Sequence, residues 1–406
     1  HYDTNGAISA IVNDKRPIAL VSLIHKAIFT NNQANTGFNE VFETTQNQAV
    51  INLVLLGYGN IGRKLTDILS QQLGLINSRA KSKIQLVAVA NSTNYIFDAQ
   101  GLEMDVVDQA LAASSHKTVD IEHSLLAIDD QQLAIVDVTA SQDVANLYET
   151  FFSKGRDVIS ASKLGITLPH TDYAQLLQLA KSNHSQWLSN VTCGAGLPIQ
   201  QSISDLVLSG DKINSVSGLF SGTLSWILNR YDGKTPFSSV VAQAKKLGLT
   251  EPDPRDDLSG KDVQRKLLII ARTMGLTLDL EQIRLTPLIP EHFLALSAED
   301  FAAASDKLDQ YMQQKWQQAN EQNMKLCYSG QLNFTQLQGE LQLQEAEVGL
   351  SFRKVTDPLT NVSPADNIVV IHSDWHSSNP LIIRGPGAGI NVTAAGIVAD
   401  IIKLAS

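Results

Sequence analysis

The sequence predicts an α/β protein in which a Rossmann-type parallel sheet is followed by an α+β domain. Three observations lead to this fold class. Between residues 51 and 190, short apolar runs of β-type residues alternate with segments of helical spacing. A glycine-rich turn joins the first apolar run to the first helical segment. From residue 325 to residue 384 the sequence alternates in the manner of half-buried strands.

The length and composition restrict the class of protein further. The 406 residues exceed what one ordinary core holds, and their composition is globular. The formal charge of -10 argues against a nucleic-acid partner and against docking on an anionic membrane. The apolar runs are too short to span a bilayer. Only two cysteines occur, Cys193 and Cys327, which excludes a disulfide framework and a thiolate zinc site and favours a reducing, cytoplasmic compartment.

Apolar periodicity places the expected elements in chain order. In the parallel-sheet part we expect strands at 51–56, 84–90, 133–138 and 157–159, and helices at 63–72, 143–153 and 169–183. In the second part we expect a strand at 213–220, and helices at 198–208, 223–230, 237–247 and 260–273. The chain then closes with a helix at 394–405. Residues 1–49 differ, with a short strand at 7–12, a helix at 18–29 and a polar linker at 30–48, and are too few for a complete domain.

Gly57, Gly59 and Gly62 form a G-x-G-x-x-G turn directly after a predicted strand and at the start of a predicted helix. In such a turn the first glycine permits the tight bend, the second lets the backbone approach a pyrophosphate, and the third packs helix against strand. The helix N-terminus offers free amide donors to the phosphates. Glycine turns can also serve the fold alone, but the surrounding βαβ pattern favours a dinucleotide site.

The end of the second predicted strand bears on the choice of cofactor. A dinucleotide site that prefers NAD usually has an Asp or Glu there, to bind the ribose 2′-hydroxyl. The sequence instead reads Val89-Ala90-Asn91-Ser92, without a carboxylate. NADP(H) is therefore favoured and NAD(H) remains possible. Arg63 is a candidate for binding the 2′-phosphate, the alternative being an ordinary solvated arginine on the helix surface.

An acidic loop, residues 250–262, precedes the helix expected at 260–273. Its two prolines predict a stiff, extended backbone. Its carboxylates either form a site or only stabilise the start of the helix. On the helix, Asp262 and Lys266 are four residues apart and lie on one face. This pair is either an ordinary salt bridge or a desolvated lysine that is oriented by Asp262 and moves a proton.

Two further polar residues directly follow predicted parallel strands. Thr139 comes after the third strand, and Lys163 comes just beyond the fourth. Ligands of open α/β sheets bind beyond the carboxyl ends of the strands. Lys163 is therefore a candidate site residue, with an exposed loop lysine as the alternative.

Taken together, these segments resemble homoserine dehydrogenases, and the similarity runs from residue 51 to residue 406. Its most specific stretches are Gly218-Leu219-Phe220-Ser221-Gly222-Thr223-Leu224-Ser225 and residues 251–266, joined by residues 194–198, 384–389 and 392–396. The first 49 residues are similar to the last strand and helix of the regulatory ACT region in bifunctional aspartokinase–homoserine dehydrogenases. The implied organisation is an N-terminal remnant and linker at 1–49, an NAD(P)-binding Rossmann domain at 50–190 plus 385–406, and a catalytic, substrate-binding and dimerisation domain at 191–384.

The resemblance implies a reversible NAD(P)-dependent interconversion of L-homoserine and L-aspartate 4-semialdehyde, in threonine and methionine biosynthesis, by a homodimer or higher homo-oligomer. By the same resemblance Lys266 is the proton donor and acceptor, Lys163 lies between cofactor and substrate, and Asp262 positions the lysine. The implied substrate-binding residues are Glu251, Asp257 and Asp262. The implied cofactor-binding residues are Gly57, Tyr58, Gly59, Asn60, Ile61, Gly62, Thr139, Lys163 and Gly389.

The family also holds a metal ion on an acidic side chain and on backbone carbonyls around a Gly-Ala-Gly-Leu turn. The matching positions here are Asn190, Cys193, Ala195 and Leu197, which implies a monovalent cation such as Na⁺. Asn190 stands where the family has the acid.

Two other functions remain open from the sequence. One is a catalytically silent NAD(P)-binding module that regulates an aspartate-pathway enzyme; loss of either lysine would have favoured it, and both are present. The other is an acylating semialdehyde dehydrogenase, which needs a nucleophilic cysteine with a nearby base. Cys193 lies in a glycine turn, but no histidine partner for it stands out in the sequence.

Overall fold

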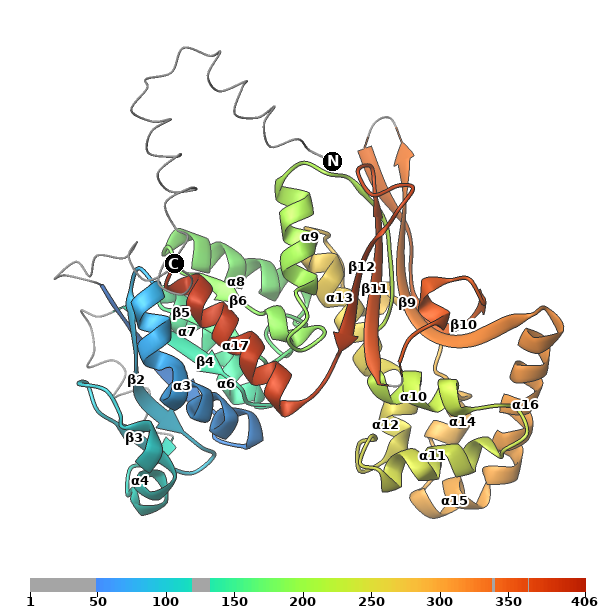
Figure 1. Ribbon diagram of the computed structural model, residues 1–406, viewed down its shortest axis with the longest axis horizontal. Helices are drawn as coiled ribbons and strands as arrows, with labels where there is room; N and C mark the ends of the chain where they lie inside the picture. Colours follow the sequence, from blue (N-terminus) through green and yellow to red (C-terminus); the bar gives the residue numbers. More distant parts are fainter. Residues whose placement is uncertain (1–48, 119–131, 338–339, 364) are drawn as a thin grey trace, which may run out of the picture. The chain divides into compact units, whose positions relative to one another are not determined.

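The computed structural model describes residues 49–118, 132–337, 340–363 and 365–406, and two six-stranded sheets organise this part of the chain (Figure 1). The strand, helix and linker expected within residues 1–48 lie outside the described residues. The mixed α/β fold class is confirmed.

The first sheet is the expected parallel one, with strand order β3-β2-β1-β4-β5-β6. Its strands are β1 (Val50–Leu56), β2 (Lys83–Ala90), β3 (Tyr95–Phe97), β4 (Leu133–Asp137), β5 (Asp157–Ser160) and β6 (Trp187–Leu188). All pairings are parallel except that of the edge strand β3 with β2. Nearly every residue of β1 and β4 is buried, as a continuous apolar run predicts for a strand covered on both faces.

Helices cover both faces of this sheet. Leu53 and Leu55 of β1 share a core with α3 (Asn60–Arg79) and with the C-terminal helix α17 (Ile390–Leu404). Val54 and Leu56 face the other way, into a core with α7 (Tyr148–Ser153) and α8 (His170–Ser182). The single helix expected at 143–153 is broken into α6 (Gln142–Asn146) and α7. The C-terminal helix α17 therefore packs on the same face of the first sheet as α3 (Figure 1).

The second sheet has the order β12-β11-β7-β9-β10-β8. Its strands are β7 (Ile213–Leu219), β8 (Arg284–Leu285), β9 (Met324–Leu337), β10 (Glu340–Lys354), β11 (Asp366–Ser373) and β12 (Leu381–Pro386). One face packs on a helical core. The longer helices of that core are α9 (Ile199–Leu208), α10 (Gly222–Arg230), α11 (Phe237–Lys246), α13 (Lys261–Thr273) and α16 (Ser305–Glu321).

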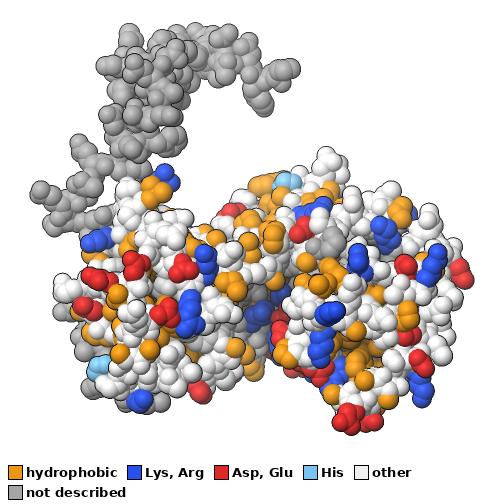
Figure 2. Space-filling model, turned by 60° about the horizontal axis from the view of Figure 1, so that its bottom comes forward, with side chains coloured by type: hydrophobic (Ala, Val, Ile, Leu, Met, Phe, Trp, Pro, Cys, Tyr) orange, Lys and Arg blue, Asp and Glu red, His pale blue; other side chains and the backbone are white. Residues whose placement is uncertain are grey.

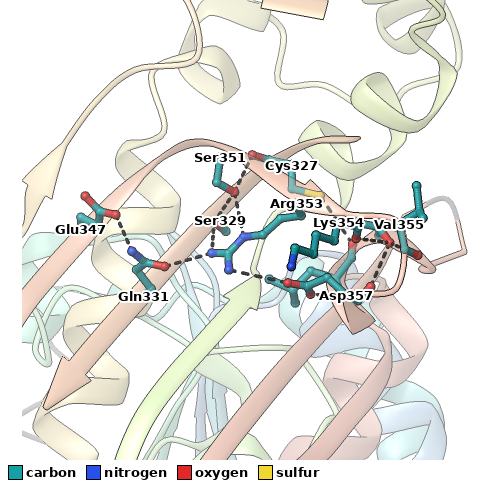
Figure 3. A network of polar contacts seen from close by, with 11 residues as sticks. Cys327, Ser329, Gln331, Glu347, Ser351, Arg353, Lys354, Val355 and Asp357 are labelled. Atoms are coloured by element: carbon teal, nitrogen blue, oxygen red, sulfur yellow. Dashed lines mark hydrogen bonds and ion pairs between the residues drawn. The ribbon is translucent and has the colours of Figure 1, made fainter. Parts of the chain in front are cut away.

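The opposite face of β9 and β10 carries a polar network (Figure 3). Tyr328 and Leu332 point into the helical core, so Ser329 and Gln331 point away from it. Arg353 donates from Nη2 to Gln331 Oε1 at 2.9 Å and from Nε to the Ser351 hydroxyl at 3.2 Å. Gln331 in turn donates to Glu347. Paired polar groups therefore line this side of the sheet.

Further features differ from the sequence expectation. A short helix, α12 (Pro254–Leu258), forms where two prolines predicted a stiff extended loop. Proline is favoured at the first position of a helix, and the Asp253 carboxylate accepts the Arg255 amide as an N-cap. No element was predicted at α16, whose sequence is mostly polar; only Leu308, Met312 and Ala319 are buried along it. The remaining short helices are α4 (Val107–Ala113), α14 (Glu291–Leu294) and α15 (Ala298–Ala303).

On the face of the described part seen in Figure 2, Lys and Arg side chains are interspersed with Asp and Glu side chains and form no single basic patch. Of the helices in the described ranges, none is both long and apolar enough to cross a membrane.

The glycine turn gives a test of the packing between β1 and α3. A Cβ on Gly62 would lie 2.2 Å from the Gly57 carbonyl oxygen, whereas one on Gly74 of the same helix would meet nothing within 4 Å. We expect Gly62→Ala to lower the free energy of unfolding by about 2 kcal/mol. Gly74→Ala, the matched control, should raise it by up to about 1 kcal/mol. Urea unfolding of both variants measures this, and equal effects would refute it.

Candidate active site

A cavity of about 970 Å³ opens at the carboxyl ends of β1, β2 and β4. Gly57, at φ +101°, could not be replaced without strain, because a Cβ there would also meet Thr139 and Val138 at 3.0–3.1 Å. A Cβ on Gly59 would meet nothing within 4 Å, so open space lies before the N-terminus of α3. Free amides at a helix N-terminus with space in front of them suit a phosphate group. The residues present therefore fit the pyrophosphate of a dinucleotide.

Four of the predicted cofactor-binding residues line this cavity. They are Gly57, Tyr58, Gly59 and Thr139. The other predicted residues lie in neighbouring elements: Asn60, Ile61 and Gly62 in the first turn of α3, Lys163 after β5, and Gly389 as the N-cap of α17. Sequence reasoning missed several lining residues, among them Thr118, Ser141 and Val144. Ser141 and Val144 lie at the N-cap and in the first turn of α6, and nothing in the local sequence marks these positions or Thr118 as cavity-lining.

The end of β2 lines the same cavity through Ala90, Asn91 and Ser92. Asn91 Oδ1 accepts the amides of Thr93 and Asn94, both at 2.8 Å, and so closes a turn. Arg63, the candidate for a 2′-phosphate, pairs instead with Asp108 at 3.0 Å on the exposed surface. An exposed pair of this kind is weak, and Arg63 is not among the residues that line the cavity.

Asp262, in the first turn of α13, lies between two lysines. Its Oδ2 is 2.9 Å from Lys266 Nζ, and its Oδ1 is 3.4 Å from Lys163 Nζ. The Lys266 side chain is only 12% exposed and also donates to the Phe220 carbonyl at 2.7 Å. An ammonium group has three N–H donors. Counting contacts among the described residues, one donor of Lys266 remains for a ligand oxygen.

The two ammonium groups keep Asp262 ionised. Burial on its own raises the pKa of this carboxyl, but the charges of Lys266 and Lys163 and their hydrogen bonds outweigh it and hold the pKa well below its usual range. The site therefore carries two cations around one anion. Such a cluster suits a substrate oxygen that gains negative charge.

The acidic loop brings the other predicted carboxylates together. Asp257 Oδ2 accepts the backbone amide of Glu251 at 2.8 Å, and the Glu251 side chain is exposed. Burial raises the pKa of Asp257, and the nearby charges of Glu251 and Asp262 raise it further. Glu251 and Asp262 therefore both lie close enough to Asp257 for their charges to affect it. Asp253 and Arg255 pair with each other, as part of the α12 cap.

The turn predicted to hold a cation is closed by amide hydrogen bonds. Asn190 Nδ2 donates to the Leu197 carbonyl at 3.4 Å, and Asn190 N donates to Asp400 Oδ2 at 3.2 Å. Ala195 has a left-handed φ of +52°, and Cys193 is fully buried. A donor thus faces a carbonyl that the resemblance assigns to the metal, and these residues do not fit a cation held in that way. In the described ranges, no three His, Cys, Asp or Glu side chains cluster as a metal site.

Sequence reasoning missed the anchor of Lys266. The Phe220 carbonyl that accepts Lys266 Nζ also accepts the side-chain amide of Asn367 at 3.3 Å. Asn367 is fully buried, and a Cβ on Gly387 would overlap it. The glycines of residues 385–389 are the only trace of this close approach in the sequence.

Comparisons with known proteins agree with this geometry. A family model described as "Homoserine dehydrogenase" matches residues 198–402, and one described as "Homoserine dehydrogenase, NAD binding domain" matches residues 57–190. Bifunctional aspartokinase/homoserine dehydrogenase 2 of Escherichia coli K12 is 39% identical over 362 residues, which cover 87% of this chain and 43% of that protein. The chain thus spans less than half the length of this relative.

Two solved structures show the same fold. A protein of unknown function from Candida auris has a TM-score of 0.78 at 28% identity and covers 88% of this chain and 98% of its own. A hyperthermophilic archaeal homoserine dehydrogenase mutant in complex with NADPH has a TM-score of 0.65 at 19% identity, covering 87% and 97%.

Asp400 gives a test of electrostatics beside the Asn190 turn. Burial raises the pKa of this carboxyl to about 6. The native state then holds the proton more tightly than the unfolded chain, so stability falls as pH rises from about 4 to 6. Asp400→Asn removes this loss. We expect the variant to gain about 2 kcal/mol relative to the parent between pH 4.5 and pH 7.5.

Urea unfolding at the two pH values measures this change. Asp67→Asn, at an exposed position on α3, is the control and should show no comparable gain. A constant difference between Asp400→Asn and its parent at both pH values would contradict the prediction.

Proposed function

This chain belongs to the homoserine dehydrogenase family, and from that premise we propose that it interconverts L-homoserine and L-aspartate 4-semialdehyde reversibly, as a step toward threonine and methionine. The observation that carries the proposal is the Asp262 carboxylate between the ammonium groups of Lys163 and Lys266. Interconverting an alcohol and an aldehyde moves a proton at one oxygen, and a lysine held by a carboxylate can move it.

The nicotinamide of the cofactor supplies or accepts the hydride in such a reaction. We assign Lys266 to the reacting oxygen, because one of its donors remains for a ligand. In the direction of reduction this ammonium stabilises the developing alkoxide and then donates its proton. Asp262 keeps Lys266 in place, and Lys163 adds a second positive charge from the other side of the carboxylate.

Recognition of the substrate is assigned to the acidic loop. Homoserine and aspartate semialdehyde both carry an α-ammonium group, which needs an anionic partner. Glu251 is exposed, and Asp257 holds its backbone amide at 2.8 Å. We assign Glu251, Asp257 and Asp262 to the amino-acid part of the substrate.

Residues 57–190 carry the NAD-binding domain of the family. For the domain limits, we assign 50–190 plus 385–406 to nucleotide binding and 191–384 to catalysis, which is supported by the shared core of α3 and α17. For the cofactor we favour NADP(H) over NAD(H), supported by the lack of a carboxylate at the end of β2.

We propose a homodimer or higher homo-oligomer formed through the second sheet, where the face of β9 and β10 that points away from the helical core presents the paired polar groups of Figure 3. We propose a cytoplasmic location, supported by two buried cysteines that are both free thiols.

The two alternatives are disfavoured by particular residues. A silent regulatory module has no need of the largely enclosed Lys266 and its carboxylate partner. An acylating mechanism needs a reactive thiolate, but burial raises the pKa of the Cys193 thiol to about 12.

The proposed reaction is tested by following NADPH consumption after addition of L-aspartate 4-semialdehyde. We expect Lys266→Ala to lower kcat about 100-fold or more, because it removes the proton donor. Lys261→Ala, at an exposed position of the same helix, is the control and should leave kcat unchanged. An inactive parent protein, or full activity in Lys266→Ala, would contradict the assigned mechanism.

The cofactor preference is tested by Asn91→Asp. The carboxylate keeps the acceptor that closes the turn with Thr93 and Asn94, while adding a partner for a ribose 2′-hydroxyl. We expect the ratio of kcat/KM for NADPH over NADH to fall about tenfold. Asn94→Asp is the control. An unchanged ratio in Asn91→Asp would show that the cofactor ribose binds elsewhere.

A further inference from the structure

Arg272 lies on the same helix as Asp262 and Lys266, and its side chain is only 1% exposed. Burying a guanidinium costs several kcal/mol unless all of its donors find partners. A buried arginine that is not itself beside the lysine cluster therefore has a structural task. Its partners identify that task.

These partners come from two separate segments. Nη1 donates to the Ile166 carbonyl, in the turn that follows β5. Nε and Nη2 donate to the Leu278 carbonyl at 3.3 and 2.9 Å, just after α13. The guanidinium carbon lies 4.6 Å from the ring centre of Tyr173 in α8. Arg272 thus joins α13 to the loop and helix that connect β5 to β6 of the first sheet.

The turn held by Arg272 carries Lys163. The Lys163 carbonyl accepts the Thr167 amide and the Thr167 hydroxyl, both at 3.0 Å, so residues 163–167 form one closed turn. The Ile166 side chain is buried in the helical core of the second sheet, although the turn belongs to the first. The position of the Lys163 backbone therefore depends on how this turn sits on α13.

Asp279 makes a second link between the same segments, beside the contacts of Arg272. Its Oδ1 accepts the His170 amide at 2.6 Å, at the first residue of α8, and lies 3.6 Å from Arg272 Nη2. One carboxylate thus neutralises the buried guanidinium and caps the helix that begins after the Lys163 turn. Arg272 and Asp279 together fix both ends of residues 166–170.

We propose that Arg272 is a positioning residue: it clamps the Lys163 turn onto α13 so that the Lys163 ammonium reaches the Asp262 carboxylate. The 3.4 Å contact between Lys163 and Asp262 joins segments that are distant in sequence, and the Arg272 clamp lies on the same helix as that carboxylate. The inference rests on the proposed function for its catalytic consequence, but its structural part can be measured without it.

The test is a double-mutant cycle of Arg272→Lys with Lys163→Ala. Lysine keeps the charge but lacks the planar fork of donors with which Arg272 spans the Ile166 and Leu278 carbonyls. We expect Arg272→Lys to lower kcat about 10- to 100-fold in the parent protein, through misplacement of Lys163. In the Lys163→Ala background it should lower kcat less than about 3-fold. Arg265→Lys, at an exposed position of the same helix, should have no effect in either background.

Hydrogen exchange of the backbone amides gives a readout independent of catalysis. In Arg272→Lys, the amides of residues 163–167 should exchange about tenfold faster, while those of β1 stay unchanged. If Arg272→Lys does not fold, Asp279→Asn tests the same clamp from its other side, with the same expected exchange.

Equal losses of kcat in both backgrounds, or unchanged exchange at 163–167, would overturn the inference. If Lys163→Ala is too slow to assay, the exchange measurement decides. A parent protein without any dehydrogenase activity would refute the proposed function instead, and faster exchange would still support the clamp.

Discussion

The electrostatic centre of this protein is one carboxylate that two ammonium groups share. Two lysines within reach of each other repel, and neither charge can be buried cheaply. Asp262 relieves this repulsion because each of its oxygens faces one lysine, at 2.9 and 3.4 Å. The Phe220 carbonyl adds a further acceptor for Lys266. The cluster depends on this arrangement, since without the carboxylate the two cations would separate.

The fold supplies the three charges from two different layers. Lys163 follows β5 at the carboxyl edge of the parallel sheet, where Thr139 and the glycine turn also lie. Asp262 and Lys266 come from α13, in the core of the second sheet. The Ile166 side chain and the Arg272 guanidinium attach the turn after β5 to the helical core of the second sheet. The turn that carries Lys163, beyond the sheet edge where the cavity opens, is thereby joined to the helix that carries the lysine we propose as the proton donor.

Family resemblance carries over position by position, and the turn at residues 190–197 shows its limit. The backbone there keeps its Gly-Ala-Gly-Leu sequence and a strained Ala195. The Asn190 side-chain amide, however, donates a hydrogen bond to the Leu197 carbonyl, which an acidic side chain cannot do when ionised. The same fold can therefore keep the shape of a turn while changing the chemistry that stabilises it.

Elements with local signals could be predicted from the amino-acid sequence alone. Continuous apolar runs predicted β1 and β4, the glycine spacing predicted the turn into α3, and the four-residue spacing paired Asp262 with Lys266. The polar helix α16 escaped prediction because only three of its residues are buried. Family resemblance already implied that residues 385–406 join the Rossmann domain. The tertiary structure was needed to show that Lys163 contacts Asp262 and that the Phe220 carbonyl anchors Lys266. These contacts join distant segments, and periodicity within one segment carries no information about which other segment will bury its face.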